Sequence, residues 1–496
     1  MQRSISGVRA FVSSHKFSVS LTAFFVLAQT VMIRFHEMWR DELQAWSIAR
    51  SAGTPLELLQ NIRYEGHPPL WHGFLFITTR LTGNPLAMQI IHISVAAATI
   101  FLIARYAPFS RLQKIFMSFG YFLFFEYGVI ARNYNLTVLL AVIFCILLTR
   151  QRKSYLGLGI VLALMAQTNA PGAIMATVFA AYALWDFLSS RPAKTWHVWK
   201  PAVLGGTIVA MSLVFFYLIT VPPANSGVSP VVSPDVRYGL STIWQAFVPI
   251  PARIATFWNT NIVASINNAV LLSLGCVIAA VLYFARNVKV LVLYIASTSG
   301  LFSFFYVKSL GSLRQQGYLF IVFLVCAWLV HEAQARDKRA SAGWRRYQSV
   351  VLWSVIGLQF MAGMFAVQKD VRITFSRSRD AANYLKANNY HRVPLVGQVD
   401  YQTAPLASWL DTEAYLIQSE SWSSYVTWAQ ARYRDVSDKE AISTAKRIAK
   451  ELKQDVILVA PHKYTGTERG LVLLHAVTDP AIIPDETYFF YRVSQD

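Results

Sequence analysis

Two short segments near the start of the chain carry side chains that could do chemistry together. The first is Trp39-Arg40-Asp41-Glu42, and the second, about 25 residues further on, is Tyr64-Glu65-Gly66-His67, followed by two prolines and a leucine. A carboxylate beside a substrate hydroxyl can take its proton as a general base, which typically contributes about 10²–10⁴-fold to a rate. We predict that Asp41 is this base and that Glu65 is the rival candidate. A second carboxylate near Asp41 would raise the pKa of one of the two, which suits a base that works near neutral pH. The alternative is a solvated loop in which Asp41 or Glu57 caps a helix.

Glu42 and His67 have less direct predicted roles. Neighbouring residues of a helix or strand point in different directions, so we expect Glu42 to orient a substrate rather than share the proton transfer with Asp41. His67 and Glu65 could together ligate a divalent metal, but no HExxH pattern or cysteine pair accompanies them. We therefore expect no metal or other cofactor, and we predict that His67 hydrogen-bonds a phosphate or fixes its loop.

The composition indicates what kind of molecule must hold these residues. Of 496 residues, 55% are hydrophobic and 14% are charged, against about 45–50% and about 25% in soluble domains, and the mean hydropathy is +0.39. The net charge of +19 comes from residues 1–367, which hold 29 basic and 10 acidic residues, whereas 368–496 hold 16 of each. Basic residues between apolar runs are typical of membrane proteins. The composition therefore excludes a soluble cytosolic enzyme and does not support a nucleic-acid partner.

Apolar runs long enough for membrane-crossing helices recur through residues 1–367. We predict eleven spans, the first of them a retained signal anchor. They cover residues 17–33, 86–104, 115–130, 136–149, 155–168, 170–188, 202–220, 261–284, 290–307, 318–335 and 348–367. The apolar segment 68–81 is predicted to be an interfacial helix lying in the membrane surface, because counting it as a span would invert every later loop.

The basic residues also predict the orientation of the chain. With the N-terminus inside, 19 of the 29 basic residues fall on the cytoplasmic side, among them Lys338 and Arg339, as the positive-inside rule requires. The first outer loop, 36–85, is then acidic and contains both segments described above. A second outer loop, 221–251, is rich in proline and is predicted to be irregular.

The last part of the chain, residues 368–496, has the composition of a soluble domain, and the same orientation places it outside. Helix-like stretches at 379–389 and 438–453 are each followed by an apolar run, and 488–493 has the pattern of an edge strand. These patterns predict a small extracytoplasmic α/β domain with its own core. The overall prediction is a multi-pass α-helical membrane domain, 1–367, with this domain attached.

The acidic segments and this topology together resemble a known class of enzymes. Asp-Glu directly after the first span, and His-Pro-Pro-Leu before an amphipathic helix, resemble the polyprenyl-phosphate-sugar-dependent glycosyltransferases of the GT-C class, which include protein O-mannosyltransferases and aminoarabinose transferases. Ala131-Arg132-Asn133-Tyr134 is similar to the Ala-Arg-x-Tyr of that class, and 311–317 is similar to an Arg-containing motif of some members. Many relatives have His or Tyr after that arginine, whereas this chain has Gln315. A role that depends on histidine is therefore not expected there.

The resemblance implies that an acidic residue of the first outer loop lies at the reaction centre and that a lipid-linked phosphate is the leaving group. A guanidinium group can bind two phosphate oxygens and neutralise charge as it develops. Arg132 and Arg314, at the outer ends of spans, are the predicted donor-phosphate ligands, with Lys308 as a third candidate. The alternative for either arginine is an interface anchor or an ion pair. The predicted substrate-binding residues are His67, Tyr64, Tyr134 and Gln316.

The predicted function is that of an inverting hexosyl- or pentosyltransferase. It would move a sugar from a polyprenyl-phosphate-linked donor to a hydroxyl of a cell-envelope lipid, glycan or protein on the outer face of the membrane. The expected location is the inner membrane of a bacterium, with the active site facing the periplasm and with membrane lipids, donor and acceptor as partners. One alternative is a multi-pass transporter or flippase of envelope precursors, which the near absence of ionisable residues in the central spans disfavours. Another is a non-catalytic envelope protein that displays its C-terminal domain.

Overall fold

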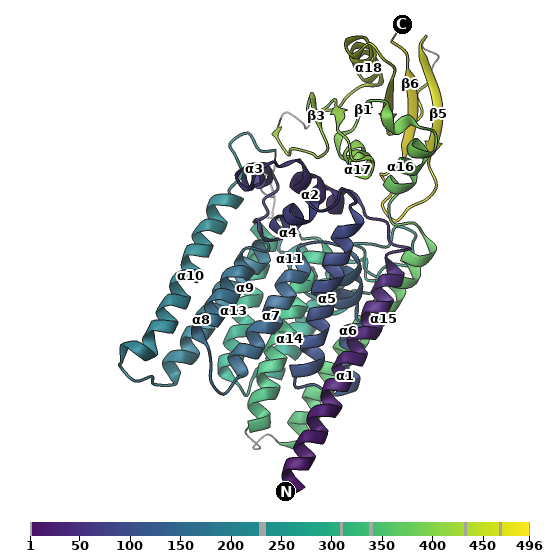
Figure 1. Ribbon diagram of the computed structural model, residues 1–496. Helices are drawn as coiled ribbons and strands as arrows, with labels where there is room; N and C mark the ends of the chain where they lie inside the picture. Colours follow the sequence, from purple (N-terminus) through teal and green to yellow (C-terminus); the bar gives the residue numbers. More distant parts are fainter. Residues whose placement is uncertain are drawn as a thin grey trace.

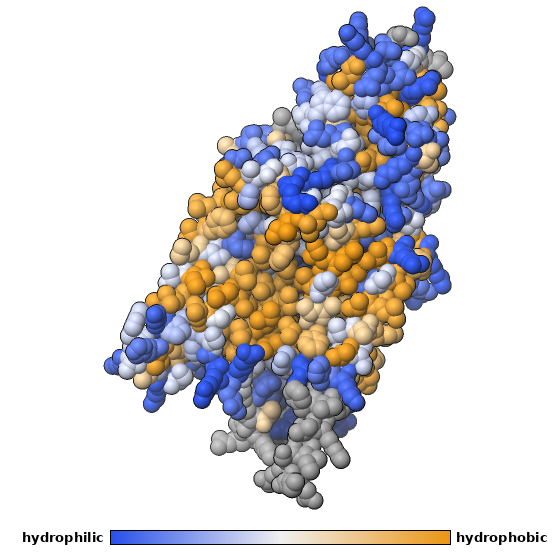
Figure 2. Space-filling view, in the orientation of Figure 1, coloured by the Kyte–Doolittle hydropathy of each residue, from blue (hydrophilic) through white to orange (hydrophobic). Residues whose placement is uncertain are grey.

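A bundle of helices makes up most of the molecule, and a smaller α/β region lies at one end of it (Figure 1). The structure is a computed structural model that describes residues 2–227, 235–307, 311–336, 341–430, 434–465 and 469–495. The N-terminus lies at the end of the bundle opposite the α/β region (Figure 1). On the face that Figure 2 shows, a broad hydrophobic surface covers the bundle and hydrophilic residues border it above and below.

The bundle and its loops are almost entirely helical. Their elements are α1 (Gln2–Met32), α2 (Arg40–Ser51), α3 (Pro55–Asn61), η1 (Ile62–Tyr64), α4 (Leu70–Thr79), α5 (Leu86–Tyr106), α6 (Arg111–Ser118), η2 (Tyr121–Val129), α7 (Tyr134–Thr149), α8 (Tyr155–Ala166), α9 (Ala170–Ser189), α10 (Trp196–Thr220), α11 (Val236–Phe247), α12 (Ile266–Phe284), α13 (Val288–Val307), α14 (Leu313–Arg336) and α15 (Ala342–Arg372).

The bundle fits a multi-pass helical membrane protein. Within the described residues, seven helices are long and apolar enough to cross a membrane, namely α5, α9, α10, α12, α13, α14 and α15, while α7 and α8 are apolar but shorter. Each of the eleven predicted spans falls on helical segments. The number of spans and the orientation of the chain remain predictions, because length and composition alone define these seven helices.

The third predicted span, 115–130, is divided in two. α6 ends at Ser118, and a nine-residue π-helix, η2, runs from Tyr121 to Val129. The division falls at Gly120, where a Cβ atom would lie 3.2 Å from both Cβ of Gln359 and the carbonyl oxygen of Met117. A residue with a side chain would therefore press on a neighbouring helix. π-Helices are rare and are frequently found at functional sites.

The outer loops contain more helix than we predicted. α4 covers most of the segment 68–81, and it packs against α2 with Trp71 and Leu75 buried. Its predicted position in the membrane surface remains a prediction. α11 occupies part of the loop predicted to be irregular and packs against α12 and α14. Residues 228–234 of that loop, and the predicted cytoplasmic Lys338 and Arg339, lie outside the described residues.

The C-terminal region combines helices with a six-stranded sheet. Its elements are α16 (Ser378–Ala387), η3 (Tyr390–Arg392), β1 (Leu395–Gly397), α17 (Asp400–Leu410), β2 (Ala414–Leu416), β3 (Ser421–Ser423), α18 (Asp438–Leu452), β4 (Val456–Ala460), β5 (Leu471–Val477) and β6 (Tyr488–Val493). The strand order is β3-β2-β1-β4-β6-β5, with β2, β1 and β4 parallel and the other pairs antiparallel. The helix α15 continues to Arg372, a few residues past the predicted boundary at 367.

The prediction that 488–493 is an edge strand was wrong. β6 lies between β4 and β5, and it pairs antiparallel with both. The strand that covers its other side, β5, has several partly exposed side chains and an irregular register between Leu473 and His475. These features weaken the alternation by which a strand is recognised in a sequence.

A single hydrophobic cluster joins the first outer loop to the C-terminal region. Leu43 and Trp46 of α2 and Trp71 of α4 belong to the same buried cluster as Leu385 of α16 and Leu406 of α17. A second cluster, between α18 and the sheet, belongs to the C-terminal region alone. The C-terminal region therefore has a core of its own and also shares one with the loop that carries the predicted acidic residues.

Candidate active site

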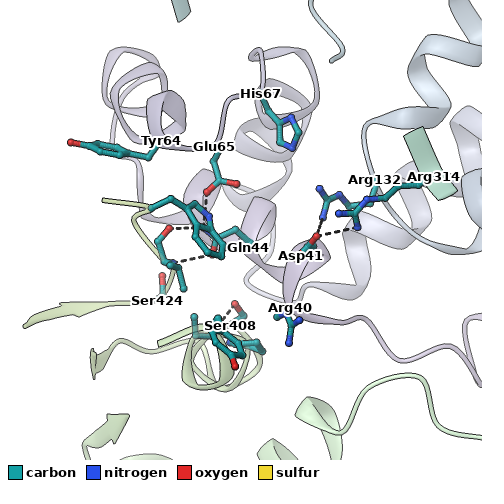
Figure 3. Close-up of a pocket in the computed structure, with 15 residues that line it drawn as sticks. Arg40, Asp41, Gln44, Tyr64, Glu65, His67, Arg132, Arg314, Ser408 and Ser424 are labelled. Atoms are coloured by element: carbon teal, nitrogen blue, oxygen red, sulfur yellow. Dashed lines mark hydrogen bonds and ion pairs between the residues drawn. The ribbon is translucent and has the colours of Figure 1, made fainter. Parts of the chain in front are cut away.

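Asp41 is positioned by the first turn of α2. The helix begins at Arg40, and the backbone N–H of Trp39 donates to Oε2 of Glu42 at 3.1 Å, which satisfies one of the free N–H groups at the helix start. A carboxylate in the first turn also interacts favourably with the positive end of the helix dipole. The Asp41 side chain is directed into a pocket together with those of Arg132 and Arg314 (Figure 3).

Both predicted phosphate ligands are paired with Asp41. Its Oδ2 lies 3.0 Å from Nη1 of Arg132 and 3.1 Å from Nη1 of Arg314, and all three side chains are at least three-quarters buried. Burial alone would raise the pKa of Asp41, but the charges of Arg132, Arg314 and Arg40 outweigh it and lower this pKa below its ordinary value. Asp41 is therefore ionised at neutral pH, and the group of one carboxylate and two guanidiniums carries a net positive charge.

The two arginines come from segments far apart in the sequence. Arg132 follows the π-helix η2, where the neighbouring Ala131 N–H donates to Oε1 of Glu42 at 2.6 Å. Arg314 is the second residue of α14, and its carbonyl oxygen accepts from the Tyr127 hydroxyl at 2.6 Å. The π-helix η2 therefore positions both arginines. Arg132 lies in the segment that follows η2, and Arg314 accepts a hydrogen bond from Tyr127, which belongs to η2.

Glu65 and His67 lie on another side of the same pocket (Figure 3). Oε1 of Glu65 accepts from Nε2 of Gln44 at 2.8 Å, and the Trp428 side chain also hydrogen-bonds Glu65. Burial raises the pKa of Glu65 to about 7, against these hydrogen bonds and the charge of Arg132. Gly66, between Glu65 and His67, has a φ of 63°, which favours glycine because it lacks a Cβ atom.

His67 is uncharged at neutral pH. Burial is the main cause that lowers its pKa, to about 3, and the positive charge of Arg132 acts in the same direction. A neutral imidazole can both donate and accept a hydrogen bond. No group of three or more His, Cys, Asp and Glu side chains suited to a metal ion occurs in the described ranges.

The pocket has a volume of about 190 Å³ and lies between the first outer loop, the ends of the bundle and the C-terminal region. Six of the predicted site residues line it, namely Asp41, Tyr64, Glu65, His67, Arg132 and Arg314. The Tyr64 hydroxyl donates to Oδ1 of Asn225 at 2.9 Å. The structure thus brings together one predicted base, its rival and both predicted phosphate-binding arginines.

Glu42 does not reach the pocket. Its carboxylate is fully buried and accepts from the backbone of Trp39 and Ala131, and Oε2 also lies 3.3 Å from Nε2 of His36. Nδ1 of His36 lies 2.9 Å from Asp370 of α15. Burial would lower the pKa of His36, but Asp370 and Glu42 outweigh burial and raise it to about 10. In the structure Glu42 thus holds the segments of Trp39, Ala131 and His36 together. We had predicted from the sequence that it orients a substrate.

Two further predicted residues, Tyr134 and Gln316, are not among the described residues that line the pocket. Tyr134 is buried, with its ring stacked on Tyr127 at a centroid distance of 6.0 Å and the Arg132 guanidinium 6.0 Å from its centroid. Gln316 is also buried, and its amide donates to the carbonyl oxygen of Gly311 at 2.8 Å. Lys308 lies outside the described residues.

Sequence reasoning missed the rest of the pocket lining. The lining residues to which the sequence analysis gave no role are Arg40, Gln44, Tyr401, Ala404, Pro405, Ser408, Ser424, Val426 and Trp428. Gln44 could have been found, because it follows Arg40 and Asp41 at the spacing of one helix turn and so shares their face. The residues from 401 onward gave no such signal, since their approach depends on how the C-terminal region packs on α2.

Comparisons with known proteins add little to this geometry. No protein-family model matches the chain, and no curated protein matches it either. Among solved structures, the chain is similar to the arabinofuranosyltransferase AftD from mycobacteria, determined by cryo-EM, with a TM-score of 0.33 and 12% sequence identity. The match covers 98% of this chain and 40% of AftD, so the chain spans less than half the length of that protein. The functional argument therefore rests on the pocket.

Proposed function

We propose that this protein is a membrane glycosyltransferase of the GT-C type, which moves a sugar from a polyprenyl-phosphate-linked donor to a hydroxyl of an envelope acceptor on the outer face of the membrane. The observation that carries the proposal is the pairing of Asp41 with both Arg132 and Arg314 in a pocket at the end of the apolar bundle. Transfer from a sugar phosphate needs a base for the acceptor hydroxyl and positive charge for the leaving phosphate, and a carboxylate with two guanidiniums can provide both. The position beside apolar helices suits a donor whose polyprenyl chain stays in the membrane.

The reaction that we propose is a single displacement. The oxygen of the acceptor hydroxyl attacks the anomeric carbon and forms the new C–O bond. The bond between that carbon and the phosphate oxygen breaks, and its electron pair leaves with the polyprenyl phosphate. Asp41 takes the proton of the hydroxyl. Attack opposite to the leaving group inverts the anomeric configuration.

Arg132 and Arg314 have two roles in this proposal. As the phosphate leaves, their guanidiniums stabilise the negative charge that develops on it. The same two groups hold the pKa of Asp41 low. When a donor phosphate draws the arginines toward itself, their pull on Asp41 weakens and its affinity for a proton rises. Donor binding would thereby prepare the base for proton transfer.

Glu65 is the second carboxylate of the pocket, and its pKa of about 7 suits a base that works near neutral pH. We assign the proton transfer to Asp41 because it is ionised, and so able to accept a proton, at neutral pH, whereas Glu65, with a pKa of about 7, is partly protonated there. Glu65 lies toward the C-terminal region, held by Gln44 and Trp428.

The test compares cells with and without the gene. Mass spectrometry of envelope glycolipids, glycoproteins and glycans should show one component that lacks a single sugar in cells without the gene. The chain restores that sugar, and the Asp41→Asn variant does not, at equal protein level. An envelope without any sugar difference, or full restoration by Asp41→Asn, would contradict the proposal.

A further inference from the structure

The C-terminal region supplies nearly half of the residues that line the pocket. Four of them are on α17, and three more follow β3; in sequence order they are Tyr401, Ala404, Pro405, Ser408, Ser424, Val426 and Trp428. In Figure 3, Ser408 and Ser424 lie on one side of the pocket, and Arg132 and Arg314 lie on the other. We call the seven residues the C-terminal wall.

The C-terminal wall is fixed to the first outer loop by direct hydrogen bonds. The Gln44 amide donates to the Val426 carbonyl oxygen at 2.6 Å and accepts from the Val426 N–H at 2.9 Å. The hydroxyls of Ser51 and Ser424 lie 2.9 Å apart, and those of Ser47 and Ser408 are also hydrogen-bonded. These hydrogen bonds, together with the hydrophobic cluster that the first outer loop and the C-terminal region share, hold the wall against the rest of the pocket.

The position of the wall relative to the arginines suggests which substrate it meets. The donor phosphate is proposed to bind at Arg132 and Arg314, which belong to the bundle. In a single displacement the acceptor must approach from the side opposite the phosphate. The C-terminal wall stands on that side, and Glu65, which hydrogen-bonds Trp428, lines the same pocket.

The chemistry of the wall suits a neutral sugar. Tyr401 and Trp428 provide aromatic rings whose flat faces can pack on the C–H groups of a sugar ring and whose polar atoms can hydrogen-bond. Next to them, Ala404 and Ser408 are small and leave room. Arg40, the cation nearest the wall, is paired with Asp485 at 2.8 Å and lies 4.9 Å from the Tyr401 ring centroid, so its charge is already balanced.

We propose that the C-terminal wall is the acceptor subsite and that the acceptor is the neutral sugar at the end of an envelope glycan. This inference rests on the proposed function and names the acceptor that the glycosyl transfer would use. Tyr401 and Trp428 pack against the acceptor ring, and Trp428 also hydrogen-bonds Glu65 on the same side of the pocket.

The test measures acceptor binding without the donor. Full-length protein in lipid nanodiscs is immobilised and exposed to three separate fractions from envelopes of cells that lack the gene: released oligosaccharides, extracted lipids and proteolytic peptides. Retained material is identified by mass spectrometry. Tyr401→Ala and Trp428→Ala are compared with the wild type, and Trp422→Ala serves as the matched control, because Trp422 is on β3 in the same region but does not line the pocket.

We expect the wild type and Trp422→Ala to retain oligosaccharides equally, and Tyr401→Ala and Trp428→Ala to retain them at least about tenfold less. Unchanged thermal unfolding and unchanged polyprenyl phosphate binding would show that these two variants are folded. Equal retention by all variants, or retention of peptides or lipids in place of oligosaccharides, would overturn the acceptor assignment. The proposed function fails separately, if polyprenyl phosphate does not bind or if the gene has no effect on envelope sugars.

Discussion

Nη1 of Arg132 lies 3.0 Å from Oδ2 of Asp41, so the residue proposed to bind the donor phosphate holds the residue proposed to take the acceptor proton. Arg314 reaches the same oxygen at 3.1 Å. A phosphate that binds these arginines must compete with Asp41 for them. Donor binding and the basicity of the carboxylate are thereby linked through two contacts.

The first prediction concerns Asp41 itself. Asp41→Asn should abolish sugar transfer, because the amide keeps the volume of the carboxylate and loses its basicity. Binding of polyprenyl phosphate should be retained or become tighter, since the arginines lose an anionic competitor. The measurements are transfer and phosphate affinity in detergent. Wild-type transfer by Asp41→Asn together with none by Glu65→Gln would reassign the base to Glu65.

The second prediction concerns the arginines. Arg132→Lys and Arg314→Lys should each weaken polyprenyl phosphate binding by about tenfold or more, because a lysine cannot make the two parallel hydrogen bonds of a guanidinium. A charge-assisted hydrogen bond contributes roughly 1.5–3 kcal/mol. Arg50→Lys is a suitable control, since Arg50 pairs with Asp411 and does not line the pocket. If the double variant binds as tightly as the parent, both arginines are structural.

The third prediction separates the two neighbouring carboxylates by stability. Glu42→Gln should lower the free energy of unfolding by several kcal/mol, because it removes one partner of a buried charged group and leaves His36 with Asp370 alone. Asp41→Asn should have a smaller effect, because Asp41, Arg132 and Arg314 keep 10–25% of their side-chain surface exposed to solvent, whereas His36 and Glu42 are fully buried. Thermal unfolding of both variants in the same detergent checks this. Equal melting temperatures would mean that Glu42 contributes no more to the fold than Asp41.

The fourth prediction concerns pH and Glu65. Its pKa of about 7 in the folded protein exceeds its ordinary value of about 4.5, so folding favours the protonated form. The resulting stability is fully present below about pH 4.5 and is lost as the pH rises through about 7. Glu65→Gln should therefore unfold at an increasingly higher temperature than the wild type between these values. A difference that does not change with pH would mean that Glu65 titrates normally.

The fifth prediction concerns the sides of the membrane. Alkaline phosphatase, which is active only outside the cytoplasm, should be active when fused after Asp496. It should be inactive when fused after Thr149, where the basic residues Arg150, Arg152 and Lys153 predict a cytoplasmic loop. The opposite pattern, with both fusions expressed, would reverse the predicted orientation and place the pocket in the cytoplasm.

Part of this pocket could be predicted from the sequence and part could not. Asp41 and Glu65 were found because acidic residues stand out next to apolar runs. Arg132 and Arg314 were found because they lie at the outer ends of predicted spans, in segments that resemble motifs of a known enzyme class. We predicted that Glu42 orients a substrate because the sequence does not show that the backbone N–H of Ala131, 89 residues away, donates a hydrogen bond to its carboxylate. The span pattern predicted the helices well because hydropathy acts locally along the chain.

The C-terminal wall was beyond sequence reasoning for a different reason. Val426 hydrogen-bonds Gln44, although the two residues are 382 positions apart in the sequence. Neither residue type is unusual in its segment, so neither indicates such a contact. The packing of the C-terminal region on α2 brings them together. The strand β6 was placed at an edge for a related reason, since the irregular β5 that covers it has a weak pattern.

The nine-residue π-helix η2 makes the pocket sensitive to the length of the chain. A π-helix holds more residues in each turn than an α-helix, so loss of one residue within 121–129 would allow this segment to wind as an α-helix. Such a deletion would leave the apolar character of the segment intact and yet change how the chain leaves it toward Arg132. In related sequences, an alignment gap within these nine residues would therefore mark a protein whose pocket is built differently, even where every charged residue is kept.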